Sequence, residues 1–211
     1  LGLEDYEAFL HEPATAERFE NLVAYDGSDP VGIGKSLATF SAFAEGVSLY
    51  SAFAVLYSFQ MRNLLKGVGQ QMKWSVRDES LHSKMGCQLF RHMCSQIPGL
   101  KEECKEHVYD AALTMHNAEM TYISKLFEMG DIEGITEYDL KHFIKKRTGD
   151  KIKELGYKPE GKFKFEYDQK SIDKMAWFDH LTGGHTHTDF FAIRPTDYSK
   201  ANEGEDFEDV W

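Results

Sequence analysis

Two side chains with metal-binding chemistry stand three residues apart in "WSVRDESLHSKMG", residues 74–86: Glu79 and His82. The segment has no proline, and its single glycine comes at its end, so it is expected to be helical. Residues i and i+3 of a helix are neighbours on one face. A carboxylate and an imidazole placed in this way can share one cation, and Glu-x-x-His is the ligand pair of di-iron and di-manganese bundles. The spacing alone is usually that of a surface pair, so a transition-metal site is predicted only if the pair also faces the core beside further ligands.

The hydrophobic pattern of this helix predicts that the pair faces the core. Glu79 belongs to a row spaced by seven residues, and His82 belongs to a neighbouring row. The rows are mostly apolar or small, and basic residues occupy the opposite side. The first side carries Met72, Glu79, Gly86, Met93, Val76, Ser83, Phe90, Ser75, His82 and Leu89, and the second carries Lys73, Arg77, Lys84 and Arg91.

A third candidate ligand, Glu45, is isolated in an apolar helix, where it is the only charged residue between Lys35 and Arg62. A buried carboxylate is costly unless it is paired, protonated or bound to a metal. The helix is long enough to span a bilayer. Its five serines, one threonine and one glutamate count against a membrane span. A helix that is apolar on all sides is typical of the centre of a bundle.

Two other pairs have similar spacing in a different context. Asp139 and His142 lie in a highly charged helix, where Asp139 belongs to a capping box that Thr136 begins. His116 and Glu119 have the reverse order. Glu119 falls on the apolar stripe of its helix, which leaves open a role in supporting the metal ligands.

The composition of the 211-residue chain excludes some classes of protein. The net charge of −11 argues against binding to nucleic acid, which requires a basic face. The three cysteines show no C-x-x-C spacing, so no structural zinc site or redox motif is predicted. A low, odd number of cysteines is typical of reduced thiols in a cytoplasmic protein.

The expected elements are mostly helices, so the fold class is all-α, a helical bundle. Short helical pieces are expected within residues 1–25 and a loop over 26–36. Further helices are expected from Ser36 to about 65, over 69–95, over 100–129 and over 136–155. Residues 162–167 are expected to form a short strand or extended loop, and 175–184 a short amphipathic piece. The chain is expected to be irregular from His185 onward.

Two segments together resemble the small (beta, radical-generating) subunit of class I ribonucleotide reductase: "EGVSLYSAFAVLYSF" and "WSVRDESLH". The resemblance implies a ferritin-like bundle in which a long apolar helix supplies one glutamate and an R-D-E-x-x-H motif supplies a glutamate and a histidine. Carried over, the metal ligands are Glu45, Glu79 and His82. They would hold part of a dinuclear iron, manganese or mixed iron/manganese centre. The same resemblance makes Asp78 a radical-transfer residue.

The C-terminal segment "AWFDHLTGGHTHTDFFAIRPTDYSKAN" is also similar to this family. The similarity implies that Tyr198 relays the radical across the subunit interface. The acidic tail "EGEDFEDVW" would dock on the large catalytic (alpha) subunit, which reduces ribonucleotides to deoxyribonucleotides. Residues 1–190 are thus expected to form the bundle and 191–211 a flexible tail. A cytoplasmic homodimer that binds neither nucleic acid nor membrane is implied.

The chain departs from the family pattern in one respect. The family's other ligands, an Asp and a second Glu-x-x-His pair, cannot be placed here, nor can its radical-bearing Tyr and relay Trp. The chain is therefore expected to be the C-terminal part of a larger bundle that is incomplete at its N-terminus.

Three alternatives remain beside this interpretation. Another ferritin-like di-metal protein would use the same ligands, and a metal-free helical fragment would use none. A nucleotide-binding enzyme would need "DPVGIGKS", residues 29–36, to cradle phosphate. Asp29 replaces the first glycine of that motif, and Pro30 lacks an amide donor, so this third alternative is disfavoured.

Overall fold

The computed structural model describes Glu4, Ala8, His11, Gly27 and residues 29–182. Its main helices are α3 (Pro30–Ala38), η1 (Thr39–Ser48), α4 (Tyr50–Met61), α5 (Lys66–Gln96), α6 (Leu100–Phe127), α7 (Glu137–Glu154) and α8 (Gln169–Thr182). These described residues form no strand. Most of the segment 1–25, the tail 191–211 and Tyr198 lie outside them.

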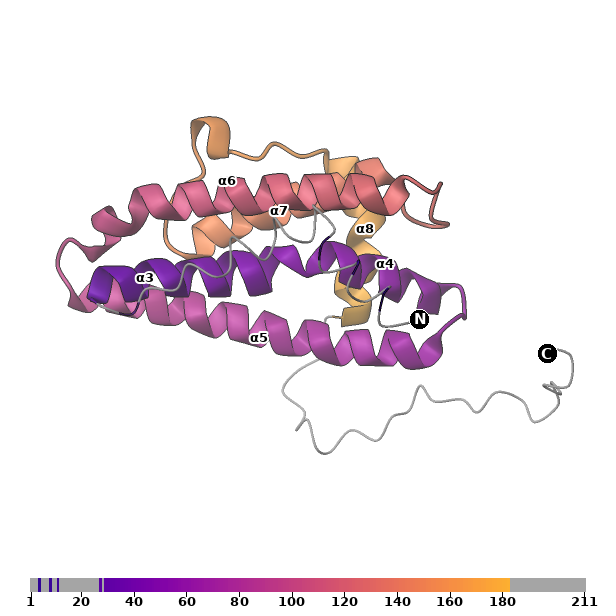
Figure 1. The fold of residues 1–211 in the computed structure, drawn as a ribbon, viewed down its shortest axis with the longest axis horizontal. Helices are drawn as coiled ribbons and strands as arrows, with labels where there is room; N and C mark the ends of the chain where they lie inside the picture. Colours follow the sequence, from indigo (N-terminus) through magenta and orange to yellow (C-terminus); the bar gives the residue numbers. More distant parts are fainter. Residues whose placement is uncertain (1–3, 5–7, 9–10, 12–26, 28, 183–211) are drawn as a thin grey trace, which may run out of the picture.

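The helices form a bundle around one central rod. α3, η1 and α4 follow one another along this rod, with α5 along one side and α6 along the other (Figure 1). η1 is a π-helix, and it packs against α5, α6 and α7. The apolar stretch that sequence analysis expected to form one helix is therefore three consecutive helical pieces with a π-helix in the middle.

Local side-chain contacts explain where two of the helices begin. Asp29 is the N-cap of α3, where its carboxylate accepts a hydrogen bond from the Gly32 amide at 2.7 Å, and Pro30 is the first helical residue. The loop expected over 26–36 was thus wrong from Pro30 onward. The cap predicted at Thr136 is confirmed, because its hydroxyl accepts from the Asp139 amide at 3.0 Å.

The segment between α7 and α8 differs from its prediction. Residues 162–167 form neither a strand nor a continuous extended loop, since a 3-10 turn, η2 (Gly161–Phe163), takes up their beginning. α8 begins at Gln169, before the expected short piece over 175–184. Ser171 explains part of this extension, since it is buried and its hydroxyl donates to Asp139 of α7 at 2.7 Å.

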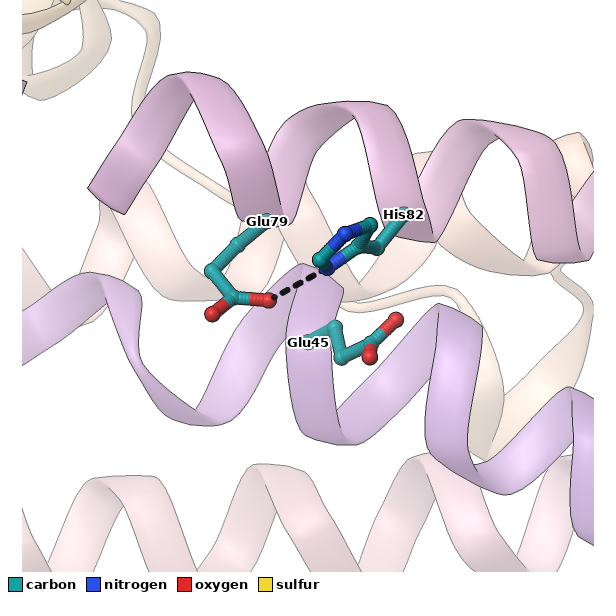
Figure 2. A group of neighbouring side chains, drawn as sticks. All are labelled: Glu45, Glu79 and His82. Carbon is teal, nitrogen blue, oxygen red and sulfur yellow. Dashed lines mark hydrogen bonds and ion pairs between the residues drawn. The ribbon is translucent and has the colours of Figure 1, made fainter. Parts of the chain in front are cut away.

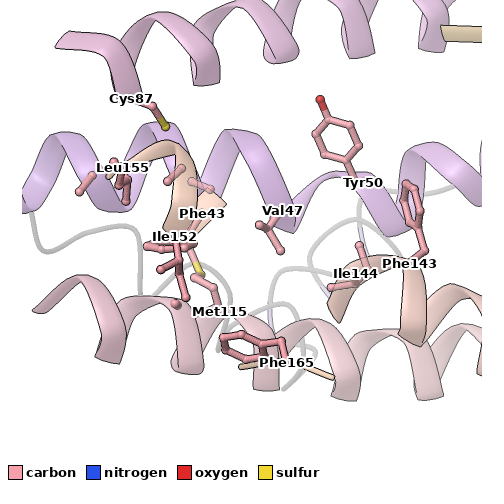
Figure 3. Packing of buried hydrophobic residues seen from close by; sticks show 14 of the residues in the cluster. Phe43, Val47, Tyr50, Cys87, Met115, Phe143, Ile144, Ile152, Leu155 and Phe165 are labelled. Atoms are coloured by element: carbon pink, nitrogen blue, oxygen red, sulfur yellow. The ribbon is translucent and has the colours of Figure 1, made fainter. Parts of the chain in front are cut away.

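The core lies where the central rod meets its neighbours. Phe43, Val47 and Tyr50 of the rod are buried with Met115 of α6 and Ile144 of α7 (Figure 3). By length and composition alone, Pro30–Met61 is apolar enough to cross a membrane. In the bundle, 56% of its most apolar window is buried inside the protein, as expected for a central helix.

Candidate metal centre

The site depends on a close crossing of η1 and α5. A Cβ atom added to Gly46 of η1 would lie 2.7 Å from the Ser83 hydroxyl of α5. A Cβ added to Gly86 of α5 would overlap the Ser41 side chain of η1. The two helices therefore meet through small residues at both places, which allows their backbones to approach closely. Glu45 stands next to the first of these contacts.

Glu45, Glu79 and His82 come together at this crossing. One ligand atom from each residue lies within 4.8 Å of those of the other two. Figure 2 shows the Glu45 side chain of η1 beside the Glu79 and His82 pair of α5. The structure therefore places the three predicted metal ligands in one cluster, and it is the only such cluster in residues 29–182 and the four isolated described positions.

The histidine lies between two carboxylates of its own helix. His82 Nδ1 is 3.3 Å from Glu79 Oε2, and His82 Nε2 is 3.6 Å from Asp78 Oδ1. The residue predicted for radical transfer, Asp78, thus lies beside the ring nitrogen that points away from Glu79. An imidazole bound to a metal through one nitrogen usually donates its other N–H to an oxygen, often of a carboxylate.

The electrostatics of the cluster favour a cation. Burial raises the pKa of the Glu45 carboxyl, and the negative charges of Glu79 and Asp78 raise it further against the opposing effect of His82. The pKa of His82 is also raised, mainly by its hydrogen bond to Glu79. The negative charge that raises the pKa of the Glu45 carboxyl can be neutralised by a shared metal ion instead of a proton.

One part of the sequence analysis was wrong: the pair does not face a dry interior among the described residues. The side chains of Glu79 and His82 are 25% and 48% exposed. The row of Val76, Ser83 and Phe90 is buried as predicted, whereas Leu89, in the row of His82, is exposed. The predicted stripe therefore covers both the buried side of α5 and the partly exposed edge that carries the ligands.

The other acidic and histidine pairs have structural partners. Asp139 accepts hydrogen bonds from Thr136, Ser171 and Lys174. His142 Nδ1 accepts one from the Asp168 amide at 2.8 Å. These contacts join α7 to α8 and to the chain before it, so this pair is part of the fold.

The reversed pair on α6 is buried. Glu119 is 0% exposed and accepts a hydrogen bond from the Ser51 hydroxyl of α4 at 2.5 Å. His116 packs against the ring of Phe165.

The phosphate-loop alternative fails, because Gly32 and Gly34 are helical residues of α3.

Comparison with known proteins then decides the family. The pattern of the family described as "Ribonucleotide reductase, small chain" matches residues 4–163. The chain belongs to this ribonucleotide reductase small-chain family. A relative from Invertebrate iridescent virus 3, named "Probable ribonucleoside-diphosphate reductase small subunit 048L", is 32% identical over 89% of this chain and 49% of its own length. A "Ribonucleoside-diphosphate reductase subunit beta" from Chlamydia pneumoniae is 24% identical over 95% of this chain and 60% of its own.

The family's fold agrees with the structure. A crystal structure from Bacillus halodurans, described as a class I ribonucleotide reductase, matches with a TM-score of 0.72 and 22% identity. The match covers 84% of this chain and 63% of that one. The predicted all-α, ferritin-like bundle is confirmed. The chain spans about half the length of the small subunit from Invertebrate iridescent virus 3.

Sequence analysis missed two residues that shape the predicted metal site of Glu45, Glu79 and His82. Gly46 permits the close helix crossing, and Arg147 of α7 donates to the Gly46 carbonyl. A glycine directly after the isolated Glu45 was a usable signal for close packing. Nothing in the sequence around Arg147 distinguishes it from the other basic residues of its helix.

Proposed function

We propose that this chain contributes to a ribonucleoside-diphosphate reductase small subunit and that Glu45, Glu79 and His82 bind metal there. The observation that carries the proposal is the clustering of these three side chains, from two helices, within 4.8 Å. Two carboxylates and one imidazole suit iron or manganese, which accept mixed oxygen and nitrogen ligation. The donor set therefore fits part of a dinuclear iron, manganese or mixed centre.

The protein's own residues have separate roles in this proposal. Glu45 and Glu79 supply negative charge, and His82 supplies Nδ1, the nitrogen that faces Glu79. Nδ1 donates its hydrogen to the Glu79 carboxylate, so a bound metal would replace that proton. Asp78, whose Oδ1 lies 3.6 Å from Nε2, would then attract the N–H that remains on the ring. When bound, a centre of this kind supplies a one-electron oxidising equivalent.

Membership of the family supports the remaining roles in this proposal. Asp78 and Tyr198 would transfer the radical, and the acidic tail that ends at Trp211 would dock on the large catalytic subunit. The large subunit would then reduce ribonucleoside diphosphates, the substrates printed in the relatives' names. We further propose a cytoplasmic homodimer.

Manganese binding tests the metal-binding part of this proposal. Electron paramagnetic resonance of free Mn²⁺ during titration of the 211-residue chain should show a saturable site. Glu79→Gln and Glu45→Gln should each weaken binding at least about tenfold, because each removes a charged ligand. Glu106→Gln on α6 is the matched control, since Glu106 is an exposed glutamate outside the cluster. Equal binding by all four proteins would refute Glu45 and Glu79 as ligands, and no binding by the wild-type chain would favour the metal-free fragment.

The tail is tested separately. A peptide of residues 203–211 should compete with the whole chain for the large subunit of the same organism. The matched control is a peptide of the same composition in scrambled order. Equal competition by both peptides would show that the tail binds only through its non-specific negative charge. No competition by either peptide would refute tail docking.

A further inference from the structure

Arg147 of α7 is a partly buried cation that the metal-binding proposal does not use. Its guanidinium lies 3.3 Å above the centre of the Tyr50 ring. Arg147 also lines a pocket of about 110 Å³ between α7 and α8, together with Asp179. Burial lowers the pKa of Arg147, although arginine keeps its charge in proteins. Partial burial costs a charged group some of its hydration, which the contacts of the guanidinium must offset.

The main polar contact of Arg147 is a single backbone oxygen. Its Nε and Nη2 groups both donate to the carbonyl of Gly46, at 3.2 and 3.1 Å. The two residues are separated by 101 positions in the sequence. Hydrogen bonds from a charged donor are stronger than neutral ones, and the planar fork of arginine fixes their direction. Arg147 therefore holds one peptide group of η1 in place.

That carbonyl belongs to the residue after Glu45 and lies inside the π-helix. A π-helix is rare, because its backbone bonds run to the fifth residue and its packing is less favourable than in an α-helix. The π-helix gives way to α4 just after Ser48. A change of hydrogen-bonding pattern leaves nearby carbonyl groups in need of other donors. Arg147 supplies such a donor pair at the turn from which the Glu45 side chain leaves the backbone.

The same guanidinium is linked to the other helix of the site. The Tyr50 ring on which Arg147 stacks carries a hydroxyl that hydrogen-bonds to the Ser80 hydroxyl of α5 at 2.7 Å. Ser80 is the residue after Glu79. Arg147 is thus linked directly to Gly46, the residue after Glu45, and through Tyr50 to Ser80, the residue after Glu79.

We propose that Arg147 is a positioning residue that fixes the Glu45 carboxylate for metal binding by holding the Gly46 carbonyl in the π-helix. This inference rests on the proposed metal-binding function. It goes beyond that function by assigning a role to a residue that touches none of the ligand side chains.

Arg147→Met tests this role, because methionine fills similar space without donors. Lys151→Met is the matched control. Lys151 lies one turn further along α7, is buried and packs at Gly46, but its amine pairs with Glu154 at 2.7 Å. Arg147→Lys is the conservative variant, which keeps the charge and loses the fork.

The first measurement is hydrogen exchange of the metal-free chain, followed by mass spectrometry on peptides that cover residues 39–50. Arg147→Met should speed exchange there at least about tenfold, and Lys151→Met should not. Unchanged exchange in Arg147→Met would overturn the proposal, whatever the chain's affinity for metal. Should Arg147→Met fail to fold, Arg147→Lys is measured in its place, with a smaller change of the same sign expected.

The second measurement is a double-mutant cycle on Mn²⁺ affinity. Arg147→Met should raise the dissociation constant at least about tenfold, the lower end for loss of a partner that orients a metal ligand. In the Glu45→Gln background it should have little further effect, because the carboxylate that it positions is already absent. An equal loss in both backgrounds would overturn the positioning role. If the wild-type chain binds no Mn²⁺, the proposed metal binding fails, and hydrogen exchange alone decides whether Arg147 holds the π-helix.

Discussion

Alanine at residue 46 is the sharpest test of the helix crossing that brings the ligands together. A Cβ atom there would stand 2.6 Å from Lys151 Cε and 2.7 Å from Ser83 Oγ. Ordinary contact begins at roughly 3.4 Å, so Ser83 or the helix that carries it must move by about 0.7 Å. The lysine end is flexible and can turn aside, whereas Ser83 is short and fully buried. The strain therefore falls on the contact between η1 and α5.

The expected change in stability is a balance of two effects. Overpacking costs about 1–3 kcal/mol, and replacing glycine by alanine inside a helix returns up to about 1 kcal/mol. Gly46→Ala should thus lower the free energy of unfolding by about 1 kcal/mol, which corresponds to roughly 2–4 °C in Tm. Because the displaced backbone adjoins Glu45, Mn²⁺ affinity should fall with it.

Urea unfolding followed by circular dichroism, together with Mn²⁺ titration, measures both effects. Gly67→Ala is the matched control, since a Cβ there meets nothing within 4 Å, and it should leave stability unchanged or slightly raised. Adding Ser83→Ala to Gly46→Ala removes the clashing hydroxyl and should restore part of the loss. A Gly46→Ala protein as stable as Gly67→Ala, with unchanged Mn²⁺ affinity, would refute the argument that close packing holds the ligands together.

Three further predictions concern the bundle. Burial lowers the pKa of His116 to about 4, so between pH 6.5 and 4 the unfolded chain takes up a proton that the folded chain excludes. The free energy of unfolding, measured by urea titration, should therefore fall between pH 7 and pH 5 by about 2 kcal/mol more in the wild type than in His116→Gln. An equal fall in both proteins would contradict this prediction. Thr136→Ala should cost about 1 kcal/mol by removing the cap of α7, and an unchanged Tm would argue against that cap. Iodoacetamide should label the partly exposed Cys94 before the buried Cys87 and Cys104, because burial raises the pKa values of those two thiols to about 11. Peptide mass spectrometry measures the order of labelling, and the opposite order would contradict this prediction.

The sequence allowed prediction of what local spacing controls. Glu79 and His82 share a face because they are three residues apart, and the Thr136 cap follows from a four-residue pattern. Asp29 was missed because Gly32 and Gly34 resemble loop residues, although Asp-Pro is itself a signal for the start of a helix. In each case, neighbouring residues decide the local conformation.

What packs against a face cannot be found by counting along one helix. The pattern of α5 correctly buried Val76 and Phe90, yet it placed the partly exposed His82 on the same side. Arg147 was invisible for a related reason: α7 carries many basic residues, and only tertiary contact distinguishes the one that reaches Gly46. Burial and long-range hydrogen bonds are properties of the assembled bundle.

The two carboxylates of the site are consequently held in different ways. Glu79 projects from a regular α-helix whose backbone bonds are local, with His82 one turn away. Glu45 projects from a π-helix, and Arg147 reaches from α7 to the carbonyl of the next residue, Gly46. The backbone hydrogen bonds of α5 keep Glu79 and His82 next to each other as long as α5 stays helical. The position of Glu45 depends in addition on the packing of α7 against η1. Weakening α7 should therefore displace Glu45 before it separates Glu79 from His82, so the affinity of the site for metal is tied to a helix that supplies no ligand.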